Sequence, residues 1–369
     1  MNRTYQSITP NAAKATYNPS DTVEFQIPTV TGPDKNGMYT AMEMQSIRIV
    51  GQLTVTPGGG SAGLQYDPDV GMNGLVSQAT CSASLVNFTR SINNLQQLNK
   101  LVGISKLQTD KVSSSQTAAE LVTSQSFPVN AYLANYVPSF CISPFVCFNL
   151  SDGHLCYDRF GNLSIRLTLA AFKDLFWETT VGAAPASTYS VSNLYLVYNN
   201  VSVPESYLKR PITFFAPEVQ DKTLDTGSAS FSFIGASGSG GCIGVLATFV
   251  NTTNYSIGTA NNTILSDPSF NSVQYKFDSN GSKIRYPLES REEFLNTSYQ
   301  ALNALRENVA RTTEVDSDLL QIINGVKFFL GFKFSQLENL SMRPFEIVLE
   351  RSNTTSYNMY TFFLNYFRV

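Results

Sequence analysis

The sequence predicts an all-β protein made of two tandem eight-stranded antiparallel jelly rolls, each with a short inserted helix. Three observations predict this fold. The composition favours strands and turns, short alternating apolar stretches are separated by turn residues, and the two halves of the chain repeat the same order of elements. With 369 residues the chain is long enough for two domains of ordinary size.

The composition is that of a strand-rich chain with many turns. Hydrophobic residues make up 43%, aromatic residues 12% and charged residues only 14%, against a usual charged share of about 25%. Ser, Thr, Asn, Tyr and Gly are abundant instead, and these residues favour strands and turns. The net charge is −3 and no Lys/Arg cluster occurs, so we expect no direct nucleic-acid binding.

The first half of the chain begins with a short irregular arm, residues 1–20. Alternation and turn signals then predict strands and one helix, "SINNLQQLNKLVG", whose apolar residues fall on one side. The predicted strands are 23–28, 46–56, 81–88, 143–150, 163–170 and 192–201, with the helix at 91–103.

The second half restarts the pattern after "PESYLKRP", residues 204–211, which is the predicted linker. Its helix has the capping-box spacing, with Ser290 three residues before Glu293. The predicted strands are 212–219, 228–235, 242–251, a hairpin over 271–286, 325–335, 343–350 and 356–369.

The two halves agree in the order of their elements rather than in their letters. The opening strands begin at residues 23 and 212, and the helices begin at residues 91 and 290. We therefore expect one jelly roll over 21–203 and a second over 212–369, because strands spaced closely with turns between them form antiparallel sandwiches.

The final strand, "SYNMYTFFLNYFRV", carries large apolar residues on both faces. A strand with one wet face would alternate apolar and polar residues. We therefore expect residues 356–369 to be buried on both sides, and the same holds for "NLYLVYNN" in the first half.

Motifs for catalysis, cofactors and metals are absent from the sequence, so the prediction is a protein that is not an enzyme and has no catalytic, cofactor or metal residues. The loop Gly58–Gly63 matches G-x-G-x-x-G but is followed by turn residues, not by the helix that a dinucleotide site requires. The single histidine, His154, has Cys147, Cys156 and Asp152 nearby, at a spacing typical of no zinc site.

Five cysteines at irregular spacing predict five free thiols. "MNRTYQSITP" has no apolar core of a signal peptide, so we expect a soluble chain synthesised in the cytosol.

Three stretches resemble the double jelly-roll major capsid proteins of icosahedral DNA viruses, the lineage of adenovirus hexon and the tectivirus-type phages. They are "VEFQIP" with "SIRIVGQLTV", "YDPDVGMNGLVSQATCSASLVNFTRSINNLQQLNKL" and "NSVQYKFDSNGSKIRYPLESREEFLNTSYQAL". The resemblance in order covers about residues 20–369. Larger members of this family carry long insertions that form towers, and only segments 107–140 and 251–270 of this chain are long enough to hold such insertions.

The resemblance implies a structural role in the virion. Three subunits would form a pseudo-hexagonal trimer that tiles an icosahedral shell. Partners would be the chain itself, minor capsid or vertex proteins, and an internal membrane. The alternative is a secreted or surface β-sandwich module that recognises glycans or receptors, in which Trp177 could stack on sugars rather than pack at an interface.

Overall fold

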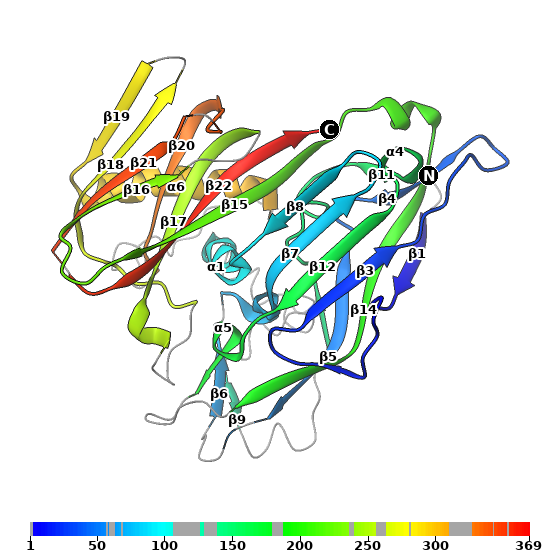
Figure 1. The fold of residues 1–369 in the computed structure, drawn as a ribbon, viewed down its shortest axis with the longest axis horizontal. Helices are drawn as coiled ribbons and strands as arrows, with labels where there is room; N and C mark the ends of the chain where they lie inside the picture. Colours follow the sequence, from blue (N-terminus) through cyan, green and yellow to red (C-terminus); the bar gives the residue numbers. More distant parts are fainter. Residues whose placement is uncertain are drawn as a thin grey trace.

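The structure is a computed structural model of the chain (Figure 1). It describes residues 3–56, 58, 63–67, 69–105, 126–128, 139–178, 187–235, 240–255, 263–279, 282–309, 327–341, 343–352 and 354–369. Most of the glycine-rich loop at 57–65 and the side chain of Trp177 lie outside this part. Parts of both segments expected to hold insertions, 107–140 and 251–270, also lie outside it.

The first roll consists of two facing antiparallel sheets. Strand β14 lies at the centre of one sheet, with β1 and β2 along one edge and β4 and β5 along the other, followed by β10 and β11. The second sheet has the order β3-β12-β7-β8. The strands are β1 Arg3–Ile8, β2 Thr16–Tyr17, β3 Thr22–Ile27, β4 Tyr39–Glu43, β5 Arg48–Thr56, β7 Val76–Ala83, β8 Phe88–Ile92, β10 Ser139–Ile142, β11 His154–Cys156, β12 Leu163–Leu169 and β14 Thr188–Val203.

The second roll repeats this topology. One sheet has the order β15-β22-β17-β20 and the other β16-β21-β18-β19. Strand β22 has the central position in its sheet that β14 has in the first roll. Strand β15 lies at the edge beside β22, as β1 and β2 lie at the edge beside β14. The strands are β15 Thr213–Leu224, β16 Ser230–Gly235, β17 Gly241–Asn251, β18 Phe270–Ser279, β19 Ser282–Leu288, β20 Phe329–Glu338, β21 Phe345–Arg351 and β22 Tyr357–Arg368.

The inserted helices occupy equivalent places, which confirms the predicted fold class. Helix α1, Leu95–Ser105, follows β8, and α6, Arg291–Val309, follows β19. At the start of α6 the predicted capping box is formed. The backbone N–H of Glu293 donates to Ser290 Oγ at 3.2 Å, and the backbone N–H of Ser290 donates to Glu293 Oε2 at 3.3 Å.

Shorter elements complete the chain. A small sheet has the order β13-β6-β9. Its strands are β6 Gly63–Tyr66, β9 Ser126–Pro128 and β13 Phe176–Glu178, and the short helices are η1 Gly71–Leu75, α4 Tyr157–Phe160, α5 Phe172–Leu175, η2 Glu205–Lys209 and η3 Thr252–Tyr255.

The predicted linker at 204–211 contains the 3-10 helix η2. No described sheet contains strands from both sides of it. Tyr207 and Leu208 of this segment cover Val201 and Val203 on the outer face of β14. We propose that residues 204–211 are the boundary between the two rolls.

Three predictions about local structure are wrong, and one strand was missed. The stretch 81–88 is the end of β7 and a turn, with Asn87 at φ 48°. The stretch 143–150 is buried but forms turns, because Pro144 has no N–H to give to a ladder. The arm 1–20 is not irregular, since β1 and β2 complete the sheet beside β14. Strand β4 was not predicted.

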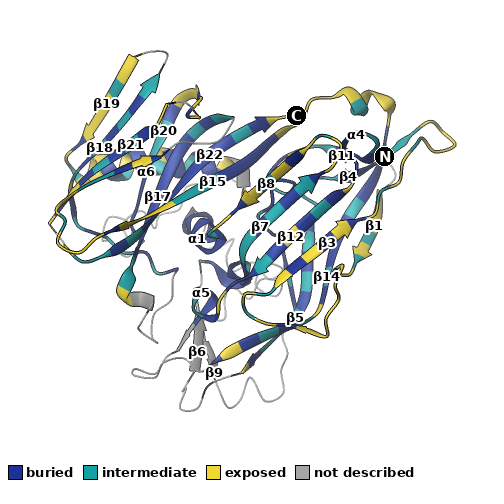
Figure 2. Cartoon of the chain, in the orientation of Figure 1, coloured by how far each residue is buried: buried dark blue, intermediate teal, exposed yellow. Residues whose placement is uncertain are grey.

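The large core spans both rolls (Figure 2). It contains residues from both inserted helices and from β14, β15 and β22, and a second core lies between the two sheets of the second roll. Strand β22 is buried on both faces, as predicted. Phe362 and Leu364 face the shared core, and Met359 and Phe363 face the second core.

Candidate functional site: the junction between the two rolls

Buried charged, polar and aromatic side chains from both rolls come together where the two rolls meet. Among the described residues, no three His, Cys, Asp or Glu side chains are close enough to hold a metal ion. The junction is therefore a candidate structural site rather than a candidate metal centre.

The two inserted helices contact each other at this junction. Residues 95–104 of α1 are all buried, although the sequence predicted a helix with one apolar side. The reason is that α1 lies between β7 and η1 of its own roll and α6 of the other. A side chain at Gly103 would place its Cβ 1.7 Å from the carbonyl oxygen of Asp69, so glycine permits this close approach.

A buried charge network joins the rolls across α1. Lys100 Nζ lies 2.6 Å from Asp67 Oδ2 and 2.9 Å from Asp69 Oδ2. From the second roll, Lys327 Nζ lies 3.1 Å from Asp69 Oδ2, and Thr263 Oγ1 donates to Asp67 Oδ2 at 2.9 Å. Two lysines therefore balance two carboxylates, so each buried charge of this network has a partner of opposite sign.

The electrostatics of this network hold Lys100 in its charged form. Burial opposes the charge, but Asp67 and Asp69 outweigh it and raise the pKa of Lys100 above its ordinary value of 10.5. The ammonium group is thus a structural ion rather than a nucleophile at neutral pH.

Aromatic rings form the second part of the junction. Phe214 of β15 stacks on Phe88 of β8 with ring centroids 4.5 Å apart. Phe148 and Phe160 of the first roll lie 6.2 and 6.3 Å from the same ring. The guanidinium of Arg90 lies 4.1 Å from the ring centroid of Phe367 in β22, a cation–π contact between the rolls.

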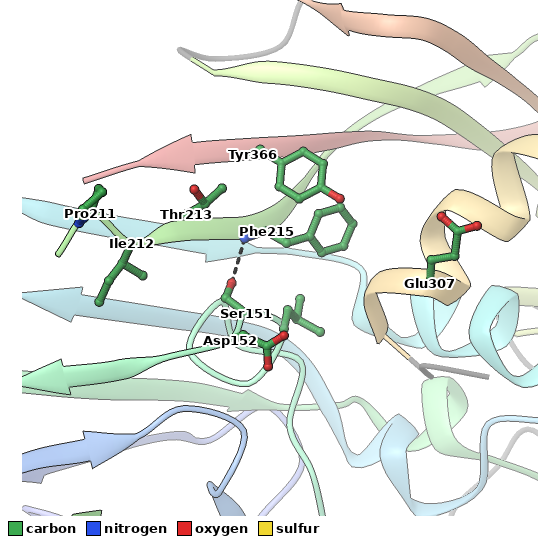
Figure 3. Close-up of a pocket in the computed structure, with 9 residues that line it drawn as sticks. Ser151, Asp152, Pro211, Ile212, Thr213, Phe215, Glu307 and Tyr366 are labelled. Atoms are coloured by element: carbon green, nitrogen blue, oxygen red, sulfur yellow. Dashed lines mark hydrogen bonds between the residues drawn. The ribbon is translucent and has the colours of Figure 1, made fainter. Parts of the chain in front are cut away.

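A hydrogen bond also crosses the junction beside a cavity of about 290 Å³ (Figure 3). The backbone N–H of Phe215 donates to Ser151 Oγ at 2.7 Å. The carboxylate of Asp152 accepts from Gln45 Nε2 at 2.8 Å. The rest of the wall includes Ile212, Tyr366 and Glu307. Among the described residues that line the cavity, Ser151 is engaged in the hydrogen bond that joins the two rolls.

His154, the candidate for a zinc site, lies in β11 with its ring edge-on to Tyr207 at 5.5 Å. Burial is the main cause that lowers the pKa of His154 below its ordinary value. One of the nearby thiols, Cys147, is bonded to Cys81 and cannot bind a metal as a thiolate.

The prediction of five free thiols is wrong. Cys81 in β7 and Cys147 in the segment after β10 form a disulfide, with Cα atoms 6.8 Å apart. They are 66 residues apart in sequence, so their spacing gave no sign that they pair. Cys141, Cys156 and Cys242 form no disulfide.

Solved structures supply the comparison with known proteins. A chain of the PBCV-1 virus capsid matches with a TM-score of 0.55 and 14% identity, covering 100% of this chain and 94% of that one. The chain has the double jelly-roll fold of viral major capsid proteins. A chain of the Sputnik virophage matches at TM-score 0.56 and 10% identity, covering 100% of this chain and 86% of that one.

The Faustovirus major capsid protein matches at TM-score 0.51 and 10% identity, covering 100% of this chain and 90% of that one. At such identities the likeness establishes the double jelly-roll fold alone. No family model and no curated protein matches the sequence.

Sequence reasoning missed the charge network at the centre of this double jelly-roll. One signal was available, because Lys100 is the only charged residue in the helix segment 91–103. A lone charge on a helix without other ions often has a buried partner. Which carboxylates pair with it was not readable, because Asp67 and Asp69 lie 33 and 31 residues before it and the second cation, Lys327, is 258 residues from Asp69.

Proposed function

We propose that the chain is a structural major capsid protein whose copies form trimers of pseudo-hexagonal outline, and that these trimers tile an icosahedral shell. The observation that carries the proposal is the repeat of one roll topology within a single chain, with both rolls joined by a buried junction. Three such chains supply six similar rolls, which is the number that a hexagonal outline requires.

The junction supports this role physically. The shared core, the stacked rings of Phe88 and Phe214 and the charges around Lys100 hold the rolls in a fixed relation. A shell subunit needs such a rigid relation, because its outline must match its neighbours on all sides. The fold likeness to viral major capsid proteins points the same way.

The proposed location is the virion, after synthesis in the host cytosol. The first partner is the chain itself, and minor capsid or vertex proteins and an internal membrane are further proposed partners. Direct nucleic-acid binding is not part of the proposal, given a net charge of −3. None of the helices described has the length and apolarity to cross a membrane.

Sedimentation of the purified chain tests the proposal. We expect a tight trimer of about 120 kDa, three times the 40.6 kDa of one chain. A monomer at micromolar concentration would contradict it and favour the glycan- or receptor-binding module. Electron microscopy of particles that contain the chain would test the icosahedral tiling directly.

A further inference from the structure

We propose that the cavity lined by the start of α1, the short helix α5 and strand β22 is a binding site for one neutral sugar ring. This inference concerns a ligand of the single chain and does not depend on how many copies assemble. It starts from a buried amide for which no described residue provides a hydrogen bond.

The cavity has a volume of about 360 Å³ and lies where α1 and α5 of the first roll approach β22 of the second (Figure 1). Its polar and aromatic lining residues are Asn94, Gln96, Gln97, Lys173, Asp174 and Tyr360. Small-molecule sites in proteins have volumes of about 300–1,000 Å³, so the cavity has room for a small ligand.

Gln96 is the side chain that indicates a ligand. Only 5% of this residue is exposed, yet its amide makes no hydrogen bond with any described residue. Two other polar residues of the same helix are equally buried and do have partners. Asn99 Nδ2 donates to the backbone oxygen of Asn73 at 3.0 Å, and Lys100 belongs to the charge network. Buried amides in proteins nearly always have a partner, so we expect the partner of Gln96 to occupy the cavity.

The neighbouring amides suit a ligand with several hydroxyl groups. A side-chain amide offers both N–H donors and a carbonyl acceptor, and a sugar hydroxyl both donates and accepts. Asn94 lines the same cavity, and its side chain also makes no hydrogen bond with a described residue. Adjacent hydroxyls of one sugar ring can therefore pair with adjacent amides of α1.

The charges that line the cavity balance. Lys173 and Asp174 are neighbours in α5, and the other described lining residues carry no charge at neutral pH. A site for a phosphate, a carboxylate or a cation would have an excess of the opposite charge. The balance in this cavity favours a neutral ligand, to which the ammonium group can donate and from which the carboxylate can accept.

The ring of Tyr360 provides an apolar surface in the same cavity. Tyr360 is half-buried and packs against the shared core. A pyranose sugar has C–H groups on its faces and hydroxyls around its edge, so one face can lie on the tyrosine ring while the edge reaches the amides. A linear polyol has no such face. Because Tyr360 belongs to the second roll and the amides to the first, a bound sugar would contact both rolls.

Saturation-transfer NMR on the purified chain tests the site. We would screen glucose, galactose, mannose and N-acetylglucosamine at millimolar concentration, with glycerol as the linear polyol. At least one sugar should bind saturably, and glycerol should not. Gln96→Leu should weaken the binding by about tenfold, because it removes the hydrogen-bonding amide and keeps an apolar side chain of similar size. Gln26→Leu, at an exposed glutamine of β3, is the matched control and should leave the binding unchanged.

A second variant keeps the test decisive if Gln96→Leu does not fold. Lys173 is half-buried on a helix of 4 residues, so Lys173→Met should leave the fold intact. Circular dichroism would confirm the fold. The variant should also weaken sugar binding by about tenfold, because it removes a charged donor from the cavity.

The outcomes separate this inference from the proposed trimer. No saturable binding of any sugar, an equal response to glycerol, or unchanged binding in either folded variant overturns the sugar site and leaves the trimer standing. A monomer that binds sugar overturns the trimer and leaves the site standing. Methyl glycosides then identify the source of the ligand. If they bind, the site takes the terminal residue of a glycan, and if only the unmodified sugar binds, the ligand is the free sugar.

Discussion

Lys100 shows how a single residue can hold the two rolls in register. Replacing Lys100 by Met would leave Asp67 and Asp69 buried with one cation instead of two. Removing one partner of a buried ion pair costs about 3–5 kcal/mol. We expect urea unfolding of Lys100→Met to show a loss of that size.

The double variant Lys100→Met/Asp67→Asn is the control, because it restores neutrality. It should recover part of the lost stability. Because the folded pKa of Lys100 is raised, the stabilisation is fully present below 10.5 and lost only as the pH rises through the higher folded value. The deficit of the single variant should therefore be constant across neutral pH, and a deficit that vanished at pH 7 would contradict the charged network.

The cysteines give a second prediction at the scale of residues. Alkylation of the unfolded chain without reductant should add three groups, at Cys141, Cys156 and Cys242, and alkylation after reduction should add five. Mass spectrometry distinguishes the two results. Five groups without reductant would restore the prediction of five thiols made from the sequence.

At the scale of elements, deletion of β22 and deletion of β1 should have different effects on folding. Strand β22 lies between β15 and β17 and is buried on both faces. Each buried aromatic contributes about 1.5–3 kcal/mol, so several exceed a typical net stability of about 5–15 kcal/mol. Deleting residues 356–369 should therefore abolish folding.

Deleting residues 1–15 should keep the fold, because residues 3–9 are largely exposed and Tyr17 remains. Circular dichroism and sedimentation would check both deletions. Folded trimers without residues 356–369 would refute the central role of β22, and loss of native secondary structure without residues 1–15 would show that β1 is needed for folding.

The elements also show what a sequence can and cannot predict here. Alternation predicted β3, β5 and β12, and the Ser290–Glu293 box predicted α6, because these signals are local. The stretch 143–150 was wrongly predicted as a strand because its apolar residues reach the core from turns. Strand β1 was not predicted because an exposed edge strand has no alternation of apolar and polar residues to detect. The junction could not be derived from spacing at all, since its contacts join residues far apart in the chain.

At the scale of the whole molecule, the shared core makes the two rolls one cooperative unit. Phe214 and Phe215 of the second roll and Leu98 of α1 belong to one buried cluster with the sheets of the first roll. Neither roll can unfold without exposing the apolar surface of the other. We therefore expect calorimetry to show one transition in which the calorimetric and van't Hoff enthalpies per cooperative unit agree.

Weakening the junction should divide that transition. Phe214→Ala removes the ring that stacks on Phe88, at a cost of about 3–5 kcal/mol for a buried Phe. We expect two separable transitions, or one clearly broadened transition. Phe249→Ala, in the core of the second roll alone, is the matched control and should lower the midpoint without splitting the transition.

Scans at several protein concentrations are needed because dissociation of a trimer makes the midpoint depend on concentration. Two transitions in the unmodified chain would show that the rolls are independent and that the junction is only a contact between them.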